Sequence, residues 1–395
     1  MKIGHCSHTI WAPGGVASYI RRIGLEQKRL GHEVVYFDLF STEENDEGAE
    51  AQTYSVKDED ALFQRVTEEK IDILHLHIGL KDHRQFPIPV IRTVHGHQPY
   101  CPSGGRFLKR QGKPCDRPYN RIGCVWNHFA SHCGSVRPLQ MLAGFRATDV
   151  EMQSLSTIPA ITVSHFLKDE MVRSGYNEDL IHVLHLPIQN VETTAQEPPK
   201  EGVPHFVFLG RITPQKGVAW LLRAIKEVKR PIHLDIAGEG YQEPEMRRLC
   251  TQLGIENQVT FHGWLSAEKV NALLSQSRAL VFPSVWHEPA GFVSLDAMTN
   301  GRAVIASRVG GIPEYVSDEM NGLLVEPNSV SALAQAIDRV AKNWSLAQAL
   351  GENGRRMAPE SFSLQIHIER LMSIYAMYTP SATAVKQENF FHAKA

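Results

Sequence analysis

Two acidic residues belong to one motif in the second half of the chain. The stretch "HEPAGFVSLDAMTNGRAVIAS" (287–307) places Glu288 before a turn with proline and glycine, and Asp296 more than one helical turn further on. Gly301 is typical of the residue that follows a helix, so we expect a short helix between the turn and Gly301. The two carboxylates could act as an acid/base pair, hold a ligand, or be unrelated, with Asp296 a plain exposed acid.

Two glycine-containing loops could bind phosphate. The loop "GRITPQKG" (210–217) offers Arg211, whose guanidinium can bind two oxygens as a fork, and Lys216, which adds a point charge. Near the amino terminus, Gly14 and Gly15 let a ligand approach the start of a helix, where free N–H groups attract anions. The alternatives are a solvated basic loop and an ordinary structural turn.

His95 follows the apolar run "IRTV" and so lies at the end of an expected strand. Ligands of parallel α/β sheets bind beyond the carboxyl ends of the strands, which makes this histidine a candidate site residue. A lone histidine at such a position can equally be a hydrogen-bonded structural residue, and the chain has 19 histidines.

Four cysteines lie in one loop-like segment, 101–133: Cys101, Cys115, Cys124 and Cys133. Their spacing, C-x13-C-x8-C-x8-C, lacks the CxxC pairs of a zinc ribbon. A metal site completed by His128 or His132, a disulfide, and reduced thiols all remain open. The segment is also basic, which could favour an anionic acceptor or a membrane surface, or simply reflect a solvated loop: its cations include Arg106, Lys109, Arg110 and Lys113.

Strands and helices alternate along most of the chain. We expect a strand at 2–7, a helix with one apolar face that ends at Gly31, and a strand at 33–38, which together form one βαβ unit. Further strands are expected within 71–77, 91–97, 159–166, 205–210, 232–238, 259–264, 279–284 and 303–307. This alternation predicts an α/β fold with parallel sheets.

The length of 395 residues exceeds one ordinary hydrophobic core, so we expect two domains. The boundary is expected in the polar, proline-rich stretch between Pro187 and Pro204. The predicted organisation is a Rossmann-like domain at 1–190, a linker at 191–204, a second Rossmann-like domain at 205–362, a helix at 363–378 that packs back on the first domain, and a flexible tail at 379–395.

The overall charge is -2, with 41 Lys and Arg against 43 Asp and Glu, which argues against nucleic acid as a partner. The chain has no run of 18 apolar residues, and its start, "MKIGHCSHTI", lacks the apolar core of a signal peptide. We therefore expect a cytoplasmic protein, for which the basic cysteine segment would allow peripheral contact with a membrane.

An ordered set of motifs resembles glycosyltransferase family 4, whose members are retaining sugar-nucleotide enzymes with the GT-B fold of two Rossmann-like domains and a cleft between them. The motifs are "PGGVASYI", "GHEV", "GRITPQKG", "HEPAGFVSLDAMTNGRAVIAS", "GGIPEYV" and "NGLLVEP". The resemblance covers roughly residues 1–378 and is densest over 206–327. It implies that the first domain serves the acceptor and the second binds the nucleotide sugar.

The resemblance also implies roles for single residues. Arg211 and Lys216 would bind the donor diphosphate, and Gly14 and Gly15 would lie near the phosphate. His95 and Glu288 would be the catalytic pair, with His95 facing the transferred sugar. Glu288 would hold the sugar hydroxyls together with the backbone of Ala290, Gly291 and Phe292. The family usually has a ribose-binding glutamate where this chain has Asp296, which is shorter by one methylene, so a changed ribose contact is expected.

The implied reaction moves a sugar from a nucleotide donor, linked to UDP, GDP or ADP, to a hydroxyl of a glycan or lipid-linked acceptor. It needs no cofactor and no metal. A sugar-nucleotide epimerase of the same architecture is the alternative. A dinucleotide-binding protein with Asp38 as its ribose ligand is a third reading, which the missing GxGxxG motif disfavours.

Overall fold

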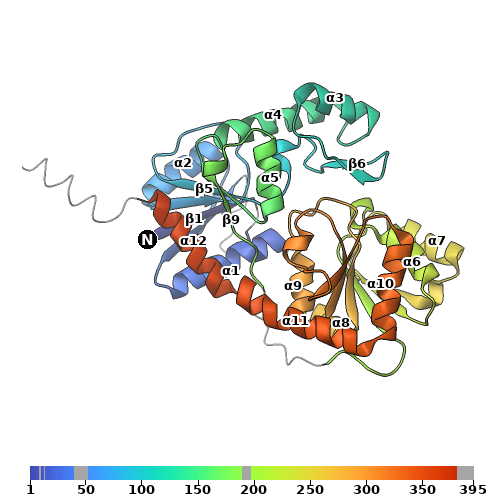
Figure 1. Ribbon diagram of the computed structural model, residues 1–395. Coiled ribbons are helices and arrows are strands. Elements are labelled where there is room, and N and C mark those ends of the chain that lie inside the picture. Colours follow the sequence, from blue (N-terminus) through green and yellow to red (C-terminus); the bar gives the residue numbers. More distant parts are fainter. Residues whose placement is uncertain (9, 13, 40–51, 189–196, 380–395) are drawn as a thin grey trace, which may run out of the picture.

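The computed structural model describes residues 1–8, 10–12, 14–39, 52–188 and 197–379. Its two halves each consist of a parallel β-sheet with helices on its faces (Figure 1). The predicted α/β fold of two Rossmann-like halves is confirmed. In the described part of the chain, no helix combines the length and apolar character that crossing a bilayer requires.

The sheet of the N-terminal half has seven parallel strands in the order β3-β2-β1-β4-β5-β8-β9. Their bounds are β1 (Lys2–Ser7), β2 (Glu33–Leu39), β3 (Gln52–Val56), β4 (Ile73–Leu76), β5 (Val90–Val94), β8 (Ala160–Thr162) and β9 (Ile181–Val183). Most of their residues are buried, because helices cover both faces of a parallel sheet.

The helices of this half are α1 (Gly15–Arg29), α2 (Glu59–Glu68), α3 (Arg121–Ala130), α4 (Pro138–Ser154) and α5 (His165–Arg173). α1 buries Tyr19, Ile20 and Ile23 of its predicted apolar face, whereas Val16, which was predicted on the same face, is exposed. Ser164 caps the start of α5, because its side chain accepts a hydrogen bond from the backbone N–H of Leu167. A short hairpin of β6 (Phe107–Leu108) and β7 (Lys113–Pro114) precedes α3.

The sheet of the C-terminal half has six parallel strands in the order β12-β11-β10-β13-β14-β15, which is the Rossmann order. The strands are β10 (His205–Leu209), β11 (His233–Ala237), β12 (Val259–Gly263), β13 (Ala279–Phe282), β14 (Ala303–Ser307) and β15 (Gly322–Val325). The helices are α6 (Val218–Glu227), α7 (Glu243–Leu253), α8 (Ala267–Ser275), α9 (Phe292–Thr299), α10 (Val330–Lys342) and α11 (Trp344–Phe362).

The last helix, α12 (Leu364–Tyr378), returns to the N-terminal half and packs against α1, which it crosses in the view of Figure 1. Its residues Leu371 and Ile374 share an apolar core with Ile20 and Ile23 of α1. At the crossing, the backbone N–H of Ile188 donates to the carbonyl of Phe362 at 2.7 Å. The two passages of the chain between the halves are therefore joined to each other.

The predicted linker and tail lie partly outside the described residues, which omit 191–196 and 380–395. Residues 197–204 contain no helix or strand. The predicted domain boundaries as such, 1–190 and 205–362, stay predictions.

Candidate active site

Two neighbouring hollows open at the carboxyl ends of the strands. The smaller, of about 240 Å³, is lined from both halves, with Tyr19 and His95 on one side and Trp286 on the other. The larger, of about 620 Å³, lies wholly on the C-terminal half and is lined by Arg211. Helix α9 contributes to both, through Phe292 to the smaller hollow and Asp296 to the larger. One ligand with two chemically different parts could therefore extend along α9.

The side chains of Lys216 and Glu288 form an ion pair beside these hollows. Lys216 ends a single turn after β10, and its Nζ lies 2.6 Å from Oε1 of Glu288. Ser284, just after β13, donates a second hydrogen bond to the same oxygen at 2.7 Å. Glu288 is only 4% exposed. A buried carboxylate needs such partners, because desolvating an unpaired charge is costly.

Gly310 and Gly311 support the loop that carries Glu288. The backbone N–H of Gly311 donates to the carbonyl of Glu288 at 2.8 Å. Gly310 has a φ of 56°, and a methyl carbon at this position would lie 2.3 Å from the same carbonyl oxygen. The "GG" of the "GGIPEYV" motif is thus required by backbone packing against the Glu288 loop.

Gly310→Ala is expected to lower the free energy of unfolding by about 2–3 kcal/mol, because it adds a steric clash to a strained backbone. Chemical denaturation measures this change. Gly254→Ala is the matched control, since Gly254 has a similar φ of 66° but no atom within 4 Å of the added carbon. Equal losses in the two variants would mean that the contact with Glu288 is unimportant.

The same motif joins the two halves through its next residues. The carboxylate of Glu314 accepts hydrogen bonds from the backbone N–H groups of His165 and Phe166, at the start of α5. The hydroxyl of Tyr315 donates to the carbonyl of Val163 at 3.0 Å. These contacts were not predicted, because the sequence does not show that this loop faces α5.

Asp296 is half-buried in the wall of the larger hollow, so it is not the plain exposed acid that one reading of the sequence allowed. Burial raises the pKa of its carboxyl to about 7, against the opposing effect of the Arg22 guanidinium. Arg22 comes from α1 of the other half, and its guanidinium also donates to the carbonyl of Ile188. Sequence analysis missed Arg22, although it lies two helical turns after Gly15.

Gly14 and Gly15 form the start of α1. Gly14 has a φ of 151°, and Gly15 lines the smaller hollow. An added side-chain carbon at either position would meet no atom within 4 Å, so both leave open space for a ligand. The loop before them is held by Asp38, whose carboxylate accepts from the backbone N–H of Ile10 at 2.8 Å.

His95 lines the smaller hollow, where the ring of Tyr19 meets it edge-on with centroids 5.5 Å apart. Burial, and to a smaller extent the charge of Arg92, lower the pKa of His95 to about 3. The imidazole is therefore neutral at physiological pH. It can exchange hydrogen bonds with a ligand but carries no charge to stabilise an anion.

Ala290 and Phe292 also line the smaller hollow, while Gly291 lies at the start of α9. Trp286 was not predicted, yet it lines the same hollow, and its ring lies 5.5 Å from the ammonium group of Lys216. The signal available in the sequence was an aromatic residue four positions after the end of β13.

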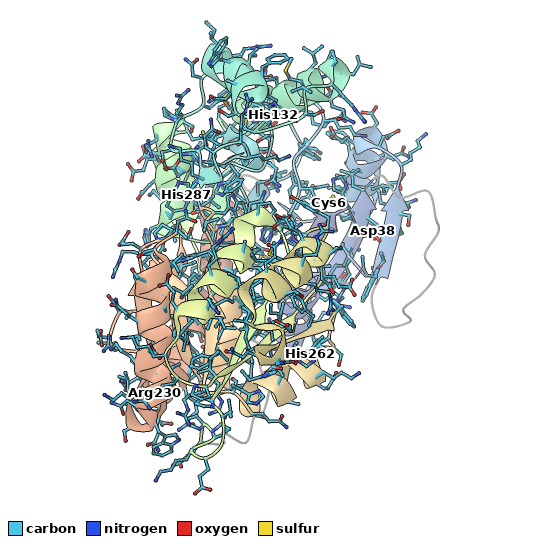
Figure 2. All side chains as sticks on the ribbon, turned by 90° about the vertical axis from the view of Figure 1, so that its right-hand side faces the viewer. Cys6, Asp38, His132, Arg230, His262 and His287 are labelled. Carbon is cyan, nitrogen blue, oxygen red and sulfur yellow. The ribbon has the colours of Figure 1, made fainter. Side chains whose placement is uncertain are left out.

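The four-cysteine segment bridges the two halves beside this site. The indole N–H of Trp286 donates to the carbonyl of Gly105 at 2.6 Å, and Nε2 of His287 lies 2.6 Å from a carboxylate oxygen of Asp116. Figure 2 shows His287 near the junction of the halves and His132 at the outer end of the N-terminal half.

All four cysteines of the segment are free thiols in the structure. The predicted alternative of a disulfide is therefore absent from the structure. Nδ1 of His128 lies 3.7 Å from Sγ of Cys133, whereas His132 is exposed. The metal site remains a prediction, which elemental analysis of the purified protein tests against reduced thiols without metal. Arg106 was counted among the cations of a solvated loop, and this prediction is wrong. Its side chain turns inward at the start of the hairpin, is 2% exposed and is paired with Glu170.

Residues 190–357 match the family described as "Glycosyl transferases group 1". The chain is 32% identical over 263 residues to the alpha-maltose-1-phosphate synthase of Mycolicibacterium smegmatis, a match that covers 60% of this chain and 68% of that protein. It is 31% identical over 243 residues to an uncharacterized glycosyltransferase of Methanocaldococcus jannaschii, covering 57% of this chain and 62% of that protein. The match thus spans less than two thirds of the second relative.

Two solved structures share the whole architecture. The sucrose-phosphate synthase of Thermosynechococcus elongatus has a TM-score of 0.69 and 21% identity, over 95% of this chain and 98% of that one. An Anabaena protein in complex with UDP and glucose has a TM-score of 0.68 and 15% identity, over 95% of this chain and 100% of that one. At these identities the comparison shows a common fold, and it confirms the expected GT-B arrangement.

Proposed function

The chain belongs to the group 1 glycosyl transferases, and from this premise we propose that it is a retaining glycosyltransferase that uses a nucleotide sugar without a metal ion or other cofactor. The observation that carries the proposal is the ion pair of half-buried Lys216 with buried Glu288, next in sequence to Pro289, which lines the smaller hollow. The small hollow would take the sugar, and the larger one the nucleotide.

The proposed donor site assigns one part of the ligand to each group. Arg211 and Lys216 would hold the diphosphate, with the N-terminus of α9 adding its partial positive charge. Gly14 and Gly15 would leave room for the phosphate, Glu288 would accept from sugar hydroxyls, and Asp296 would face the ribose. The acceptor would enter from the N-terminal half, past His95.

In the reaction, the acceptor hydroxyl attacks the anomeric carbon of the sugar. The bond between that carbon and the diphosphate oxygen breaks, the nucleoside diphosphate leaves with the bonding electrons, and the proton of the acceptor hydroxyl passes to the departing phosphate oxygen. Arg211, Lys216 and the α9 N–H groups would stabilise the charge that grows on this oxygen. Glu288 would hold the sugar in place and would not act as a nucleophile, because its charge is already paired with Lys216.

Epimerisation of the sugar nucleotide is the alternative on the same fold. The relatives named above are a synthase and a glycosyltransferase by name, which supports transfer over epimerisation. An epimerase would also need no acceptor hydroxyl. Slow release of free sugar from the nucleotide in the absence of an acceptor would indicate a transferase and not an epimerase.

The donor is expected to stabilise the folded protein. We expect the nucleotides of one base to raise the melting temperature by several degrees in a thermal-shift screen with UDP, GDP, ADP and their sugars. A ligand that binds only the folded state stabilises that state. If Glu288 holds the sugar, the sugar nucleotide should raise the melting temperature more than the bare nucleotide does. No shift at millimolar concentration for any of them would contradict the donor site.

We also propose that the enzyme is cytoplasmic and works on a glycan or lipid-linked acceptor at an anionic membrane surface. Helix α3 exposes Ile122 at 84% and Trp126 at 68%, close in sequence to the exposed cations Lys109, Arg110 and Lys113. Between residues 101 and 143 the sequence has one acidic residue, Asp116. Apolar side chains beside cations suit the boundary of an anionic bilayer.

Co-sedimentation with phosphatidylglycerol vesicles tests this membrane contact. Binding should weaken in the double variant Ile122→Ser and Trp126→Ser, and also in high salt. Tyr241→Ser removes an exposed aromatic side chain of the C-terminal half and should leave binding unchanged. Equal binding of all three proteins would remove the membrane from the proposal.

A further inference from the structure

A row of buried histidines lies beneath the smaller hollow. His5 is on β1, His75 is on β4, and His77 directly follows β4. These two strands are neighbours, and His5 is the register partner of His75. His95 follows β5, which is the next strand of the sheet. Only His95 reaches the hollow, whereas the other three are buried. The row therefore connects the hollow with the interior of the N-terminal half.

One line of hydrogen bonds runs from His95 inward to α1. Nε2 of His95 lies 3.3 Å from Nδ1 of His77. Nε2 of His77 lies 3.1 Å from Nδ1 of His5. Nε2 of His5 lies 2.8 Å from Oε1 of Gln27, a fully buried residue of α1. Each ring is thus hydrogen-bonded to the next one in the line.

The spacing of His5, His75 and His77 would also suit a metal ion, since one ring nitrogen of each lies within 4.8 Å of the others. Every one of their six ring nitrogens, however, has a hydrogen-bonding partner within the protein. His75 uses its two nitrogens on the hydroxyls of Tyr375 and Thr93, at 2.6 Å each. A satisfied hydrogen-bond network explains this cluster without a ligand.

The residue at the inner end of this line, Gln27, determines which nitrogen of each histidine carries the proton. Oε1 of Gln27 is a carbonyl oxygen and can only accept, so Nε2 of His5 carries the proton. A neutral imidazole has one N–H, and therefore Nδ1 of His5 accepts from Nε2 of His77. By the same step, Nδ1 of His77 accepts from Nε2 of His95. Nδ1 of His95 is then left without a proton.

Neutral rings are expected here, because burial lowers the pKa of each of these groups. The pKa of His5 falls to about 4 and that of His95 to about 3. The pKa of His77 also lies well below the usual value, through burial and then through the neighbouring histidines. One proton per ring is thus the state at physiological pH.

The orientation of the Gln27 amide decides the direction of the whole line. Its Nε2 faces the hydroxyl of Tyr375 at 3.5 Å and the sulfur of Met372 at 4.0 Å. A thioether sulfur is a weak acceptor and cannot donate. The Tyr375 hydroxyl can donate or accept and fits either orientation, but the reversed amide would place a carbonyl oxygen against the sulfur, which has no proton to donate. The observed orientation is therefore favoured by the sulfur contact on α12.

We propose that Gln27, acting through His5 and His77, holds His95 in the tautomer that carries its proton on Nε2, so that Nδ1 accepts a hydrogen bond from a sugar hydroxyl in the smaller hollow. This inference rests on the proposed function, because it takes the occupant of that hollow to be a sugar. Gln27, His5 and His77 are positioning residues. His95 would select for a sugar hydroxyl that donates, because its own N–H is already used on Nδ1 of His77.

Nuclear magnetic resonance of the full chain with ¹⁵N-labelled histidine reads the tautomer directly. In the unliganded protein, Nδ1 of His95 should resonate as an unprotonated nitrogen and Nε2 as a protonated one, with the signal assigned by its loss in His95→Gln. A protonated Nδ1 in the wild-type protein would overturn the proposal. This readout needs no substrate and no variant of Gln27.

Gln27→Leu removes the carbonyl that orders the line, so the two nitrogens of His95 should shift toward each other as both tautomers become populated. KM for the sugar nucleotide should rise about 2- to 10-fold with kcat nearly unchanged, the loss of roughly one hydrogen bond in the bound state. Gln64→Leu is the matched control, since it makes the same change on α2, where the amide bonds to Glu68.

The possible results separate the two proposals. An unchanged His95 signal in a folded Gln27→Leu variant would show that Gln27 does not set the tautomer. The expected tautomer in a protein that binds no sugar nucleotide would leave the hydrogen-bond line intact and remove the proposed function. The wild-type spectrum decides the tautomer even if Gln27→Leu does not fold.

Discussion

Lys216→Met is expected to lower kcat/KM for the sugar nucleotide by about 100- to 1000-fold, the usual loss when one group that stabilises a leaving charge is removed. Two effects combine in this variant. The diphosphate loses a cation, and Glu288, which is 4% exposed, loses the only cation with which the structure pairs it among the described residues. Steady-state kinetics with the donor found in the thermal-shift screen measures the change.

Lys226→Met is the control for this variant, because Lys226 is an exposed cation in the last turn of α6. It should retain full activity. Glu288→Gln keeps the shape of the side chain and removes its charge, so the double variant with Lys216→Met should lose less than the product of the two single losses. Fully multiplicative losses would mean that the two residues act separately.

Asp296→Asn is expected to stabilise the protein at pH 8 and to weaken nucleotide binding in the same step. The pKa of Asp296 is raised to about 7 by burial, against about 3.9 in an unfolded chain. A raised pKa means that the folded state holds this proton more firmly. Its stabilising contribution is complete below about pH 4 and is lost as the pH rises to 7.

The asparagine variant lacks this loss, so its advantage in the free energy of unfolding should grow between pH 4 and pH 7. The whole difference between these pKa values would amount to about 4 kcal/mol, and because the side chain is only half-buried, the advantage at pH 8 should reach on the order of 2 kcal/mol. Denaturation of both proteins at pH 5 and pH 8 measures the difference. Asp169→Asn, a change on the exposed side of α5, should show no such trend. An advantage that is constant with pH would contradict the raised pKa.

Affinity for the nucleotide should fall about 10-fold or more in the same variant, if the carboxylate accepts from the ribose hydroxyls. Isothermal titration with the nucleotide measures this. Unchanged affinity would remove Asp296 from the site. Asp296→Glu restores the length that the family usually has, so it should bind the nucleotide at least as well as the wild-type protein.

The fold was largely predictable because its main elements have strong local signals. The strand at 2–7 and the helix face of Tyr19, Ile20 and Ile23 appear where the apolar pattern places them. The hairpin of β6 and β7 was not predicted, since two-residue strands leave no pattern. α11 was also missed, because it carries Pro359 inside the helix, where proline is disfavoured.

The candidate site was predictable where residues follow strands of one half. Arg211, Lys216 and Glu288 all come from loops at one edge of a single sheet. Contacts between the halves were not predictable. The clearest case is Arg22, whose charge acts on Asp296 of the other half. Such contacts depend on how two cores dock, and sequence periodicity reports only the packing within each. The histidine line is hidden for a related reason: its members are spaced over 90 residues and meet only through strand order.

The return of α12 to the N-terminal half limits how the halves can move. The chain passes from one half to the other after Ile188 and comes back at Ser363, and the hydrogen bond from Ile188 to Phe362 fastens the two passages together. A pair of tethers at one place acts as a pivot: the halves can rotate about it, but they cannot slide far past one another. A rotation about this pivot would have to break the contacts that cross between the halves, such as the hydrogen bond from Trp286 to Gly105 of the cysteine segment.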